Sequence, residues 1–174
     1  KDSSNFVDDG IKVERKVELY EHQTVSLQEI QKRREAGIKA FLIVLPTAAG
    51  KSKIAEEDLR TFAEGKQKFR GLILVPGVNL LLDWEERIKA SLPELKDKID
   101  IRTYAFAARH YTDTTPDYYN YLVVDEAHHA VAPVLKRVVQ YYRTEFTIGL
   151  TATDQRPDKR KLETVFGSYT TSLS

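Results

Sequence analysis

The chain has 174 residues, of which 41% are hydrophobic, and its 27 Lys and Arg side chains nearly balance 26 Asp and Glu for a formal charge of +1. This length suits one domain with a sizeable core, and the charge balance excludes a polybasic chain, so any nucleic-acid-binding surface must be local. The lack of cysteine excludes disulfides, thiolate zinc sites and a cysteine nucleophile, and no apolar run reaches membrane-spanning length, so we expect a cytoplasmic protein without a membrane partner.

The first part of the chain predicts an extension and then a helix. Residues 1–18 are interpreted as an N-terminal extension, and residues 19–174 as one domain. An amphipathic helix is predicted from Gln23 to Ala36, where Gly37 provides a C-terminal stop. The apolar positions expected on this helix are Val25, Leu27 and Ile30.

Strands and helices alternate through the rest of the chain. Short apolar runs predict buried strands at 41–45, 72–75, 99–103, 121–124 and 146–150. Helical spacing between these runs predicts helices from about residue 52 to 64, at 78–90, at 104–110, and from Pro133 onward. The expected core face of the last helix comprises Val134, Leu135, Val138 and Tyr142. This alternation indicates an α/β fold with a doubly wound parallel sheet.

A phosphate-sized loop follows the first strand. Its residues are Pro46, Thr47, Ala48, Ala49, Gly50, Lys51 and Ser52. Backbone N–H groups and the positive end of the next helix would bind phosphates there, with Lys51 on the β and γ phosphates and the Ser52 hydroxyl on Mg²⁺. Leu45 stands where the general pattern has an earlier glycine, so an ordinary strand-to-helix turn is the alternative.

Two carboxylates follow the strand at 121–124 directly. Ligands of open parallel sheets collect at the carboxyl ends of the strands, so Asp125 and Glu126 are expected to face the same crevice as the phosphate loop. Asp125 suits orientation of Mg²⁺ through its water shell, and Glu126 suits positioning or deprotonation of an attacking water. A solvated acidic turn is the simpler alternative, although it leaves the upstream loop unexplained.

Three segments together resemble motifs I, II and III of superfamily 2 helicases: residues 46–52, the DEAH sequence at 125–128, and 150–153. The sequence around these motifs is most similar to that of helicase modules related to type III restriction subunits. The resemblance implies a RecA-like ATPase domain that uses ATP and Mg²⁺, with Lys51, Asp125 and Glu126 as its catalytic residues.

The resemblance also assigns roles outside the hydrolytic site. Gln23 carries an amide able to bond the adenine N6/N7 edge, and a nearby aromatic, Tyr20, is the candidate stacking partner. His128 would couple the nucleotide site to Thr151 and Thr153 through hydrogen bonds. The candidate contacts to a nucleic-acid backbone, at turns that could equally serve packing alone, are Gly77 and Thr103.

Other polar and aromatic clusters favour simpler interpretations. The adjacent His128 and His129 point in different directions from a helix start and lack a third ligand, which argues against a metal site. The tyrosines at 118, 119 and 121 are expected to pack against the sheet rather than stack on bases.

The chain departs from the helicase pattern in two ways. Ala48 stands where many relatives have glycine, and residues 154–174 are too few for a second RecA-like domain. Arg156 lies near the third motif, but no local pattern makes it an arginine finger.

We therefore expect the first motor domain of an ATP-dependent nucleic-acid helicase or translocase, paired in the full-length protein with a second RecA-like domain. DNA is favoured over RNA, and the oligomeric state is undetermined. The alternatives are a P-loop kinase or other NTPase that does not act on nucleic acid, and a non-catalytic module that binds ATP or nucleic acid.

Overall fold

A six-stranded parallel sheet forms the centre of the protein in the computed structural model, which describes residues 23–45, 48–152, 165–166 and 170–172. The strand order is β3-β2-β4-β5-β1-β6, and all neighbouring strands run parallel. The strands are β1 Ala40–Val44, β2 Gly71–Val75, β3 Ile99–Thr103, β4 Tyr121–Asp125, β5 Phe146–Thr151 and β6 Thr170–Ser172. All five predicted strands are therefore present, and the doubly wound parallel sheet is confirmed.

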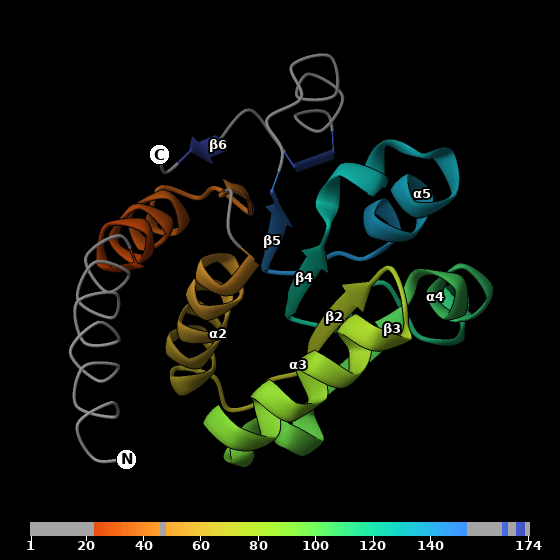
Figure 1. Ribbon diagram of the computed structural model, residues 1–174, viewed down its shortest axis with the longest axis horizontal. Helices are drawn as coiled ribbons and strands as arrows, with labels where there is room; N and C mark the ends of the chain where they lie inside the picture. The colour runs from red at the N-terminus through yellow and green to blue at the C-terminus, as the bar shows by residue number, and fades with distance from the viewer. Residues whose placement is uncertain (1–22, 46–47, 153–164, 167–169, 173–174) are drawn as a thin grey trace, which may run out of the picture.

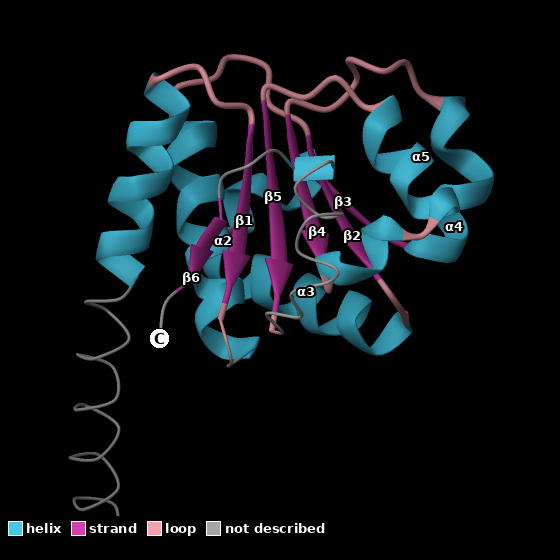
Figure 2. Cartoon of the chain, turned by 90° about the horizontal axis from the view of Figure 1, so that it is seen from above, coloured by secondary structure: helices cyan, strands magenta, loops and turns pink. Residues whose placement is uncertain are grey.

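Helices cover both faces of this sheet, as Figures 1 and 2 show. One face packs against the helix of residues 23–35, α2 and α3, and the other packs against α4 and α5. The labelled helices are α2 Ala48–Glu64, α3 Val78–Ser91, α4 Tyr104–His110 and α5 Pro133–Tyr141, with short 3₁₀ segments η1 Pro93–Lys98, η2 Tyr111–Asp113 and η3 Ala127–Val131. Alternate residues of each strand enter opposite cores, as in β1, where Phe41 and Ile43 face one layer while Leu42 and Val44 face the other.

Two predicted helix faces were partly wrong. On the helix of residues 23–35, Ile30 is fully buried but Val25 is 58% exposed. Ser26, one turn before Ile30 and on the same side of the helix, is fully buried instead. On α5, Leu135 and Val138 are buried as predicted, whereas Val134 is 57% exposed.

A buried ion pair joins the helix of residues 23–35 to α2. The guanidinium of Arg34 donates two hydrogen bonds of 2.9 Å to the two carboxylate oxygens of Asp58, whose side chain is 2% exposed. The hydroxyl of Tyr121 on β4 donates to the same carboxylate at 2.6 Å. Burial together with the negative charge of Asp58 raises the pKa of Tyr121, so this hydroxyl keeps its proton. One carboxylate thus ties two helices to the centre of the sheet.

None of the helices among the described residues is both long and apolar enough to cross a membrane. Tyr20, Pro46, Thr47 and Thr153 lie outside the described residues, as does the predicted extension at 1–18.

Replacing Arg34 by Ala should lower the free energy of unfolding by about 3 kcal/mol, because it leaves the buried Asp58 carboxylate without its cation. Chemical denaturation measures the loss. Lys32→Ala on the exposed side of the same helix is the matched control and should change stability by no more than about 0.5 kcal/mol. Equal effects of the two substitutions would contradict a stabilising role for the buried pair.

Candidate nucleotide site

The candidate site residues gather at one edge because every strand ends there. The phosphate loop follows β1, Gly77 follows β2, Thr103 ends β3, Asp125 ends β4 and Thr151 ends β5. In the sheet order, β5 lies between β1 and β4, so Thr151 stands between the phosphate loop and the two carboxylates. The parallel sheet thus collects chemistry that is spread over more than a hundred residues of sequence.

The phosphate-loop helix begins earlier than predicted. α2 starts at Ala48 rather than after Lys51, so Gly50, Lys51 and Ser52 belong to its first turns. Their N–H groups therefore lie at the positive end of a seventeen-residue helix, where an anion is stabilised. The side chains of Ala48 and Ala49 lie outside what the structure describes.

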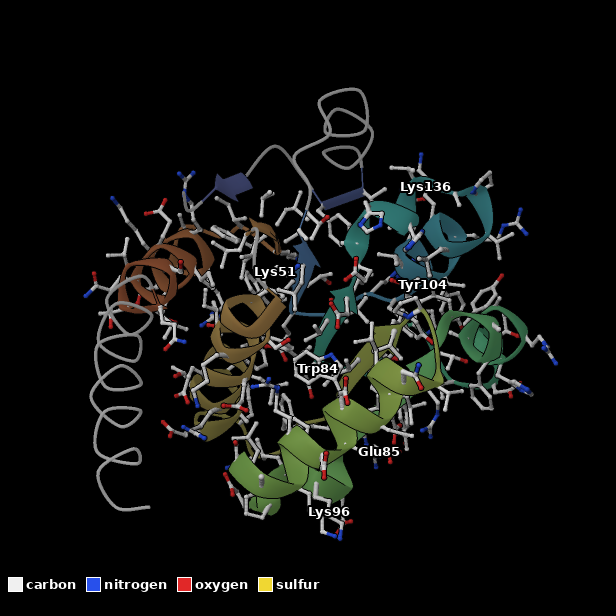
Figure 3. All side chains as sticks on the ribbon, in the orientation of Figure 1. Lys51, Trp84, Glu85, Lys96, Tyr104 and Lys136 are labelled. Atoms are coloured by element: carbon white, nitrogen blue, oxygen red, sulfur yellow. The ribbon has the colours of Figure 1, made fainter. Side chains whose placement is uncertain are left out.

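Lys51 is a buried cation without an acceptor in the part of the chain that the structure describes. Its side chain is 2% exposed, and among the described residues its ammonium Nζ has no hydrogen-bond partner. Burial lowers the pKa of Lys51, and the negative charges of Glu126 and Asp125 oppose that shift. Figure 3 shows Lys51 at the start of α2, near the ends of β1 and β5. An anionic oxygen is the kind of acceptor that could satisfy such a buried ammonium.

Asp125 is held by neutral donors on both carboxylate oxygens. The indole Nε1–H of Trp84 on α3 donates to Oδ2 at 2.8 Å, and the backbone N–H of Glu126 donates to Oδ1 at 2.9 Å. Burial raises the pKa of Asp125, while these two hydrogen bonds and Lys51 oppose the rise. Each carboxylate oxygen still has a lone pair available for a hydrated cation.

The backbone at Asp125 and Glu126 is held by a hydroxyl from α4. Glu126 has φ of 52°, in the left-handed region that non-glycine residues rarely adopt. The hydroxyl of Tyr104, the first residue of α4, donates to the backbone carbonyl oxygens of Asp125 and Glu126. Burial raises the pKa of Tyr104, so the hydroxyl remains a donor. These contacts help hold Glu126 in a conformation that its own sequence does not favour.

His128 links the second motif to the third. Its Nδ1 lies 3.1 Å from the Thr151 hydroxyl oxygen and 3.6 Å from Glu126 Oε2. The tight packing of β5 beside η3 makes this approach possible, because a Cβ added to Gly149 would lie 3.1 Å from the Cβ of Ala127. The structure therefore brings together two of the three residues predicted to couple the motifs, Thr153 being outside the described residues.

The remaining predicted residues take varied positions. Gln23 opens the helix of residues 23–35 and lines a groove of about 720 Å³ with Lys53 and Glu57 of α2. Gly77 precedes α3 in an extended conformation, and the Thr103 hydroxyl caps α4 by accepting from Phe106 N–H at 3.2 Å. This cap gives Thr103 a structural task that the sequence interpretation did not assign.

The histidine pair and the tyrosines at 118, 119 and 121 were the other polar and aromatic clusters considered from the sequence. Among the described residues no group of three or more His, Cys, Asp or Glu side chains could hold a metal ion. Tyr121 is fully buried, and the hydroxyl of Tyr119 donates to Asp100 at 2.7 Å. The guanidinium of Arg70 covers the ring of Tyr118 at 4.5 Å. The prediction that these tyrosines pack against the sheet is confirmed.

Sequence reasoning missed Trp84 and Tyr104, which reach Asp125 and Glu126 from other elements. The signal available was that the one tryptophan of the chain follows the turn after the second strand, and that Tyr104 follows the end of the third.

A family model described as the type III restriction enzyme, res subunit, matches residues 16–156. The chain belongs to this family. Among curated relatives, it is 30% identical over 156 residues to the DNA 3'-5' translocase XPB2 of Sulfurisphaera tokodaii, covering 82% of this chain and 32% of that protein. It is 29% identical to the putative ATP-dependent helicase IRC3 of Saccharomyces cerevisiae, covering 74% of this chain and 22% of that protein. The chain thus spans about a third or less of these relatives.

Solved structures support the same fold for this member of the res-subunit family. The Pyrococcus furiosus Hef helicase domain matches with a TM-score of 0.71 at 22% identity, over 88% of this chain and 38% of that chain. The Sulfolobus solfataricus SWI2/SNF2 ATPase core in complex with dsDNA matches with a TM-score of 0.70 at 21% identity, over 85% of this chain and 36% of that chain. The predictions of a superfamily 2 relationship and a RecA-like fold are confirmed.

Lys51→Met should raise the free energy of unfolding of the nucleotide-free protein by about 1 kcal/mol near pH 7, because it removes a buried ammonium for which the described residues provide no acceptor. The pKa of Lys51 is lowered by folding, so below its ordinary value of 10.5 the unfolded chain binds this proton more readily. The gain should therefore shrink as pH rises toward 10.5. Thermal melts from pH 7 to 10 measure it.

Lys53→Met, two residues along the same helix, is the matched control. The ammonium of Lys53 pairs with Glu56 at 2.7 Å and with Glu57 at 3.2 Å, so its loss should destabilise the protein. A gain in stability from both substitutions would contradict a special cost at Lys51.

Proposed function

We propose that this chain is the ATP-binding half of a nucleic-acid helicase or translocase that hydrolyses ATP with Mg²⁺ when a second RecA-like domain closes on it. The observation that supports this most directly is the buried ammonium of Lys51, which has no hydrogen-bond partner among the described residues and lies at the edge that also carries Asp125 and Glu126. An acceptor-free cation beside two carboxylates suits a triphosphate with its metal ion. We also propose a cytoplasmic location, which is compatible with the use of ATP and nucleic acid.

The donor set fits a hydrated Mg²⁺. Asp125 offers carboxylate oxygens that are held in place from two sides, and Ser52 offers a hydroxyl in the first turns of α2. When bound, Mg²⁺ would neutralise charge on the β and γ phosphates. Lys51 would bind the phosphate oxygens, and the left-handed backbone of Glu126 would direct its carboxylate toward an attacking water, from which it takes a proton.

Gln23 is proposed to bind the adenine, because its groove is shared with Lys53 near the start of α2. His128 and Thr151 are proposed to transmit the state of the nucleotide to the end of β5. Tyr20, Pro46, Thr47 and Thr153 complete the proposed nucleotide and coupling sites from positions outside the described residues.

The nucleic acid is proposed to lie across the turns that follow β2 and β3. Gly77 supports this because a Cβ added there meets no atom within 4 Å among the described residues, so the backbone is open to a close contact. DNA is favoured over RNA because the relative with 30% identity is named a DNA translocase.

Lys51→Ala should weaken ATP binding by roughly 10- to 100-fold, since it removes a charged hydrogen bond to phosphate. Glu126→Gln should leave binding intact but reduce hydrolysis at least about 100-fold, because it removes the proposed base. Calorimetry and phosphate release measure the two effects, with hydrolysis assayed on the chain joined to a second RecA-like domain. Equal ATP binding by wild type and Lys51→Ala would refute the proposed nucleotide site.

The 174-residue chain alone should hydrolyse ATP slowly with or without nucleic acid, because an arginine finger from a second domain can contribute about 10³-fold or more in rate. Phosphate release with single-stranded DNA, duplex DNA and RNA tests this. Efficient stimulated turnover by the chain alone would contradict the need for a second domain, and turnover indifferent to every polymer after joining one would favour a kinase or other NTPase.

Gly77→Ala should weaken binding of single-stranded DNA several-fold without loss of stability, because φ of −161° suits alanine while the methyl group occupies the approach to the backbone. Fluorescence anisotropy with a labelled oligonucleotide measures it. Gly65→Ala is the matched control, since it is equally open but follows the far end of α2. Unchanged affinity in Gly77→Ala would argue that this turn serves packing alone.

A further inference from the structure

The side chain of Trp84 extends from α3, the helix after β2, to the carboxylate of Asp125 at the end of the neighbouring strand β4. Trp84 lies on α3, which follows β2, and β2 is the neighbour of β4 in the sheet. The indole is 2% exposed and belongs to the core that α2 and α3 share with the sheet. Figure 3 shows Trp84 directed from α3 toward the strand ends. Its one polar atom thereby reaches the edge that carries the site.

The bond that Trp84 makes is directed at a carboxylate and not at a backbone group. Nε1 donates to Asp125 Oδ2 at 2.8 Å, while the other oxygen accepts from Glu126 N–H. Two donors on opposite oxygens set the rotation of the carboxylate about its side-chain bond. An indole N–H is a hydrogen-bond donor only and does not titrate near neutral pH. It can therefore hold the ionised carboxylate of Asp125 without binding a cation itself.

We propose that Trp84 is a positioning residue that orients the Asp125 carboxylate for the water shell of Mg²⁺ and makes α3 part of the metal site. This inference rests on the proposed function and deepens it. Partners that orient a metal-binding side chain from behind tune metal affinity strongly, even though they touch neither metal nor nucleotide.

The position of Trp84 on α3 gives this bond a second consequence. α3 begins at Val78, directly after the Gly77 turn. On the same helix, a guanidinium nitrogen of Arg87, Nη1, lies 3.6 Å from Oε1 of Glu56 on α2. A rotation of α3 would therefore move two side chains together: Trp84, which donates to Asp125, and Arg87, which lies beside Glu56 of α2. The Gly77 turn, which is proposed to contact the nucleic acid, is thus followed by the same helix that carries the donor to Asp125.

Trp84→Phe tests the proposal, because it keeps an aromatic ring in the core and removes the N–H. Binding of a fluorescent ADP analogue to the 174-residue chain is measured while Mg²⁺ is titrated. The Mg²⁺ concentration that gives half of the metal-dependent binding should rise about 10-fold, whereas binding in EDTA should stay as in wild type. An unchanged Mg²⁺ midpoint in the folded variant would overturn the proposal.

Ile88→Val is the matched control for lost packing. Ile88 lies one turn further along α3, is 2% exposed, and carries no polar atom. Its truncation should lower stability without moving the Mg²⁺ midpoint, and an equal shift in both variants would attribute the effect to packing. Lys51→Ala separates the two levels of inference: if it binds the analogue as wild type does, the proposed function fails, whatever Trp84→Phe does.

A measurement without substitution at this position keeps the proposal testable if Trp84→Phe does not fold. Trp84 is the one tryptophan of the chain, so its emission reports on the Asp125 bond without a competing signal. At saturating nucleotide, Mg²⁺ should change the emission, and Ser52→Ala should move the midpoint of that change to higher Mg²⁺. Emission that is identical in Mg²⁺ and in EDTA would overturn the proposal.

Discussion

The parallel alignment of the strands is the constraint on which the site depends. Parallel strands require a crossover for each connection, and each crossover here starts at the same edge of the sheet. The phosphate loop, the two carboxylates and Thr151 therefore meet although they are far apart in sequence. The helices that start at this edge also bring Trp84 and Tyr104 to it, which gives Asp125 and Glu126 donors from two further elements.

Three buried carboxylates show how the protein separates stability from chemistry. Asp58 has a bidentate arginine and a tyrosine hydroxyl, and Glu56 has Lys53 at 2.7 Å. Asp125 accepts hydrogen bonds from neutral donors, and the nearby Lys51 ammonium makes no hydrogen bond among the described residues. The first two carboxylates are satisfied by protein alone, whereas the charges at the site are left available for a ligand at a cost in stability.

Local chemistry made much of this predictable. Short apolar runs located the strands, and Gly50-Lys51-Ser52 after the first run and Asp125-Glu126 after the fourth indicated phosphate and metal chemistry at their ends. Burial of individual side chains was less predictable, as Val25 and Val134 show. Both belong to helices whose buried side is decided by the neighbouring elements, so one turn of apolar residues could not define it.

The sequence by itself determined the order of the elements, the family and the residue types suited to ATP. Those features depend on contiguous patterns, because hydrophobic period, glycine position and charge act within a few residues. Only the tertiary structure decided that Arg34 would neutralise Asp58, that Glu126 would adopt a left-handed backbone, and that Trp84 would hold Asp125. These depend on which strands become neighbours, and the β2–β4 pairing that brings Trp84 to Asp125 joins segments separated by β3 in the chain.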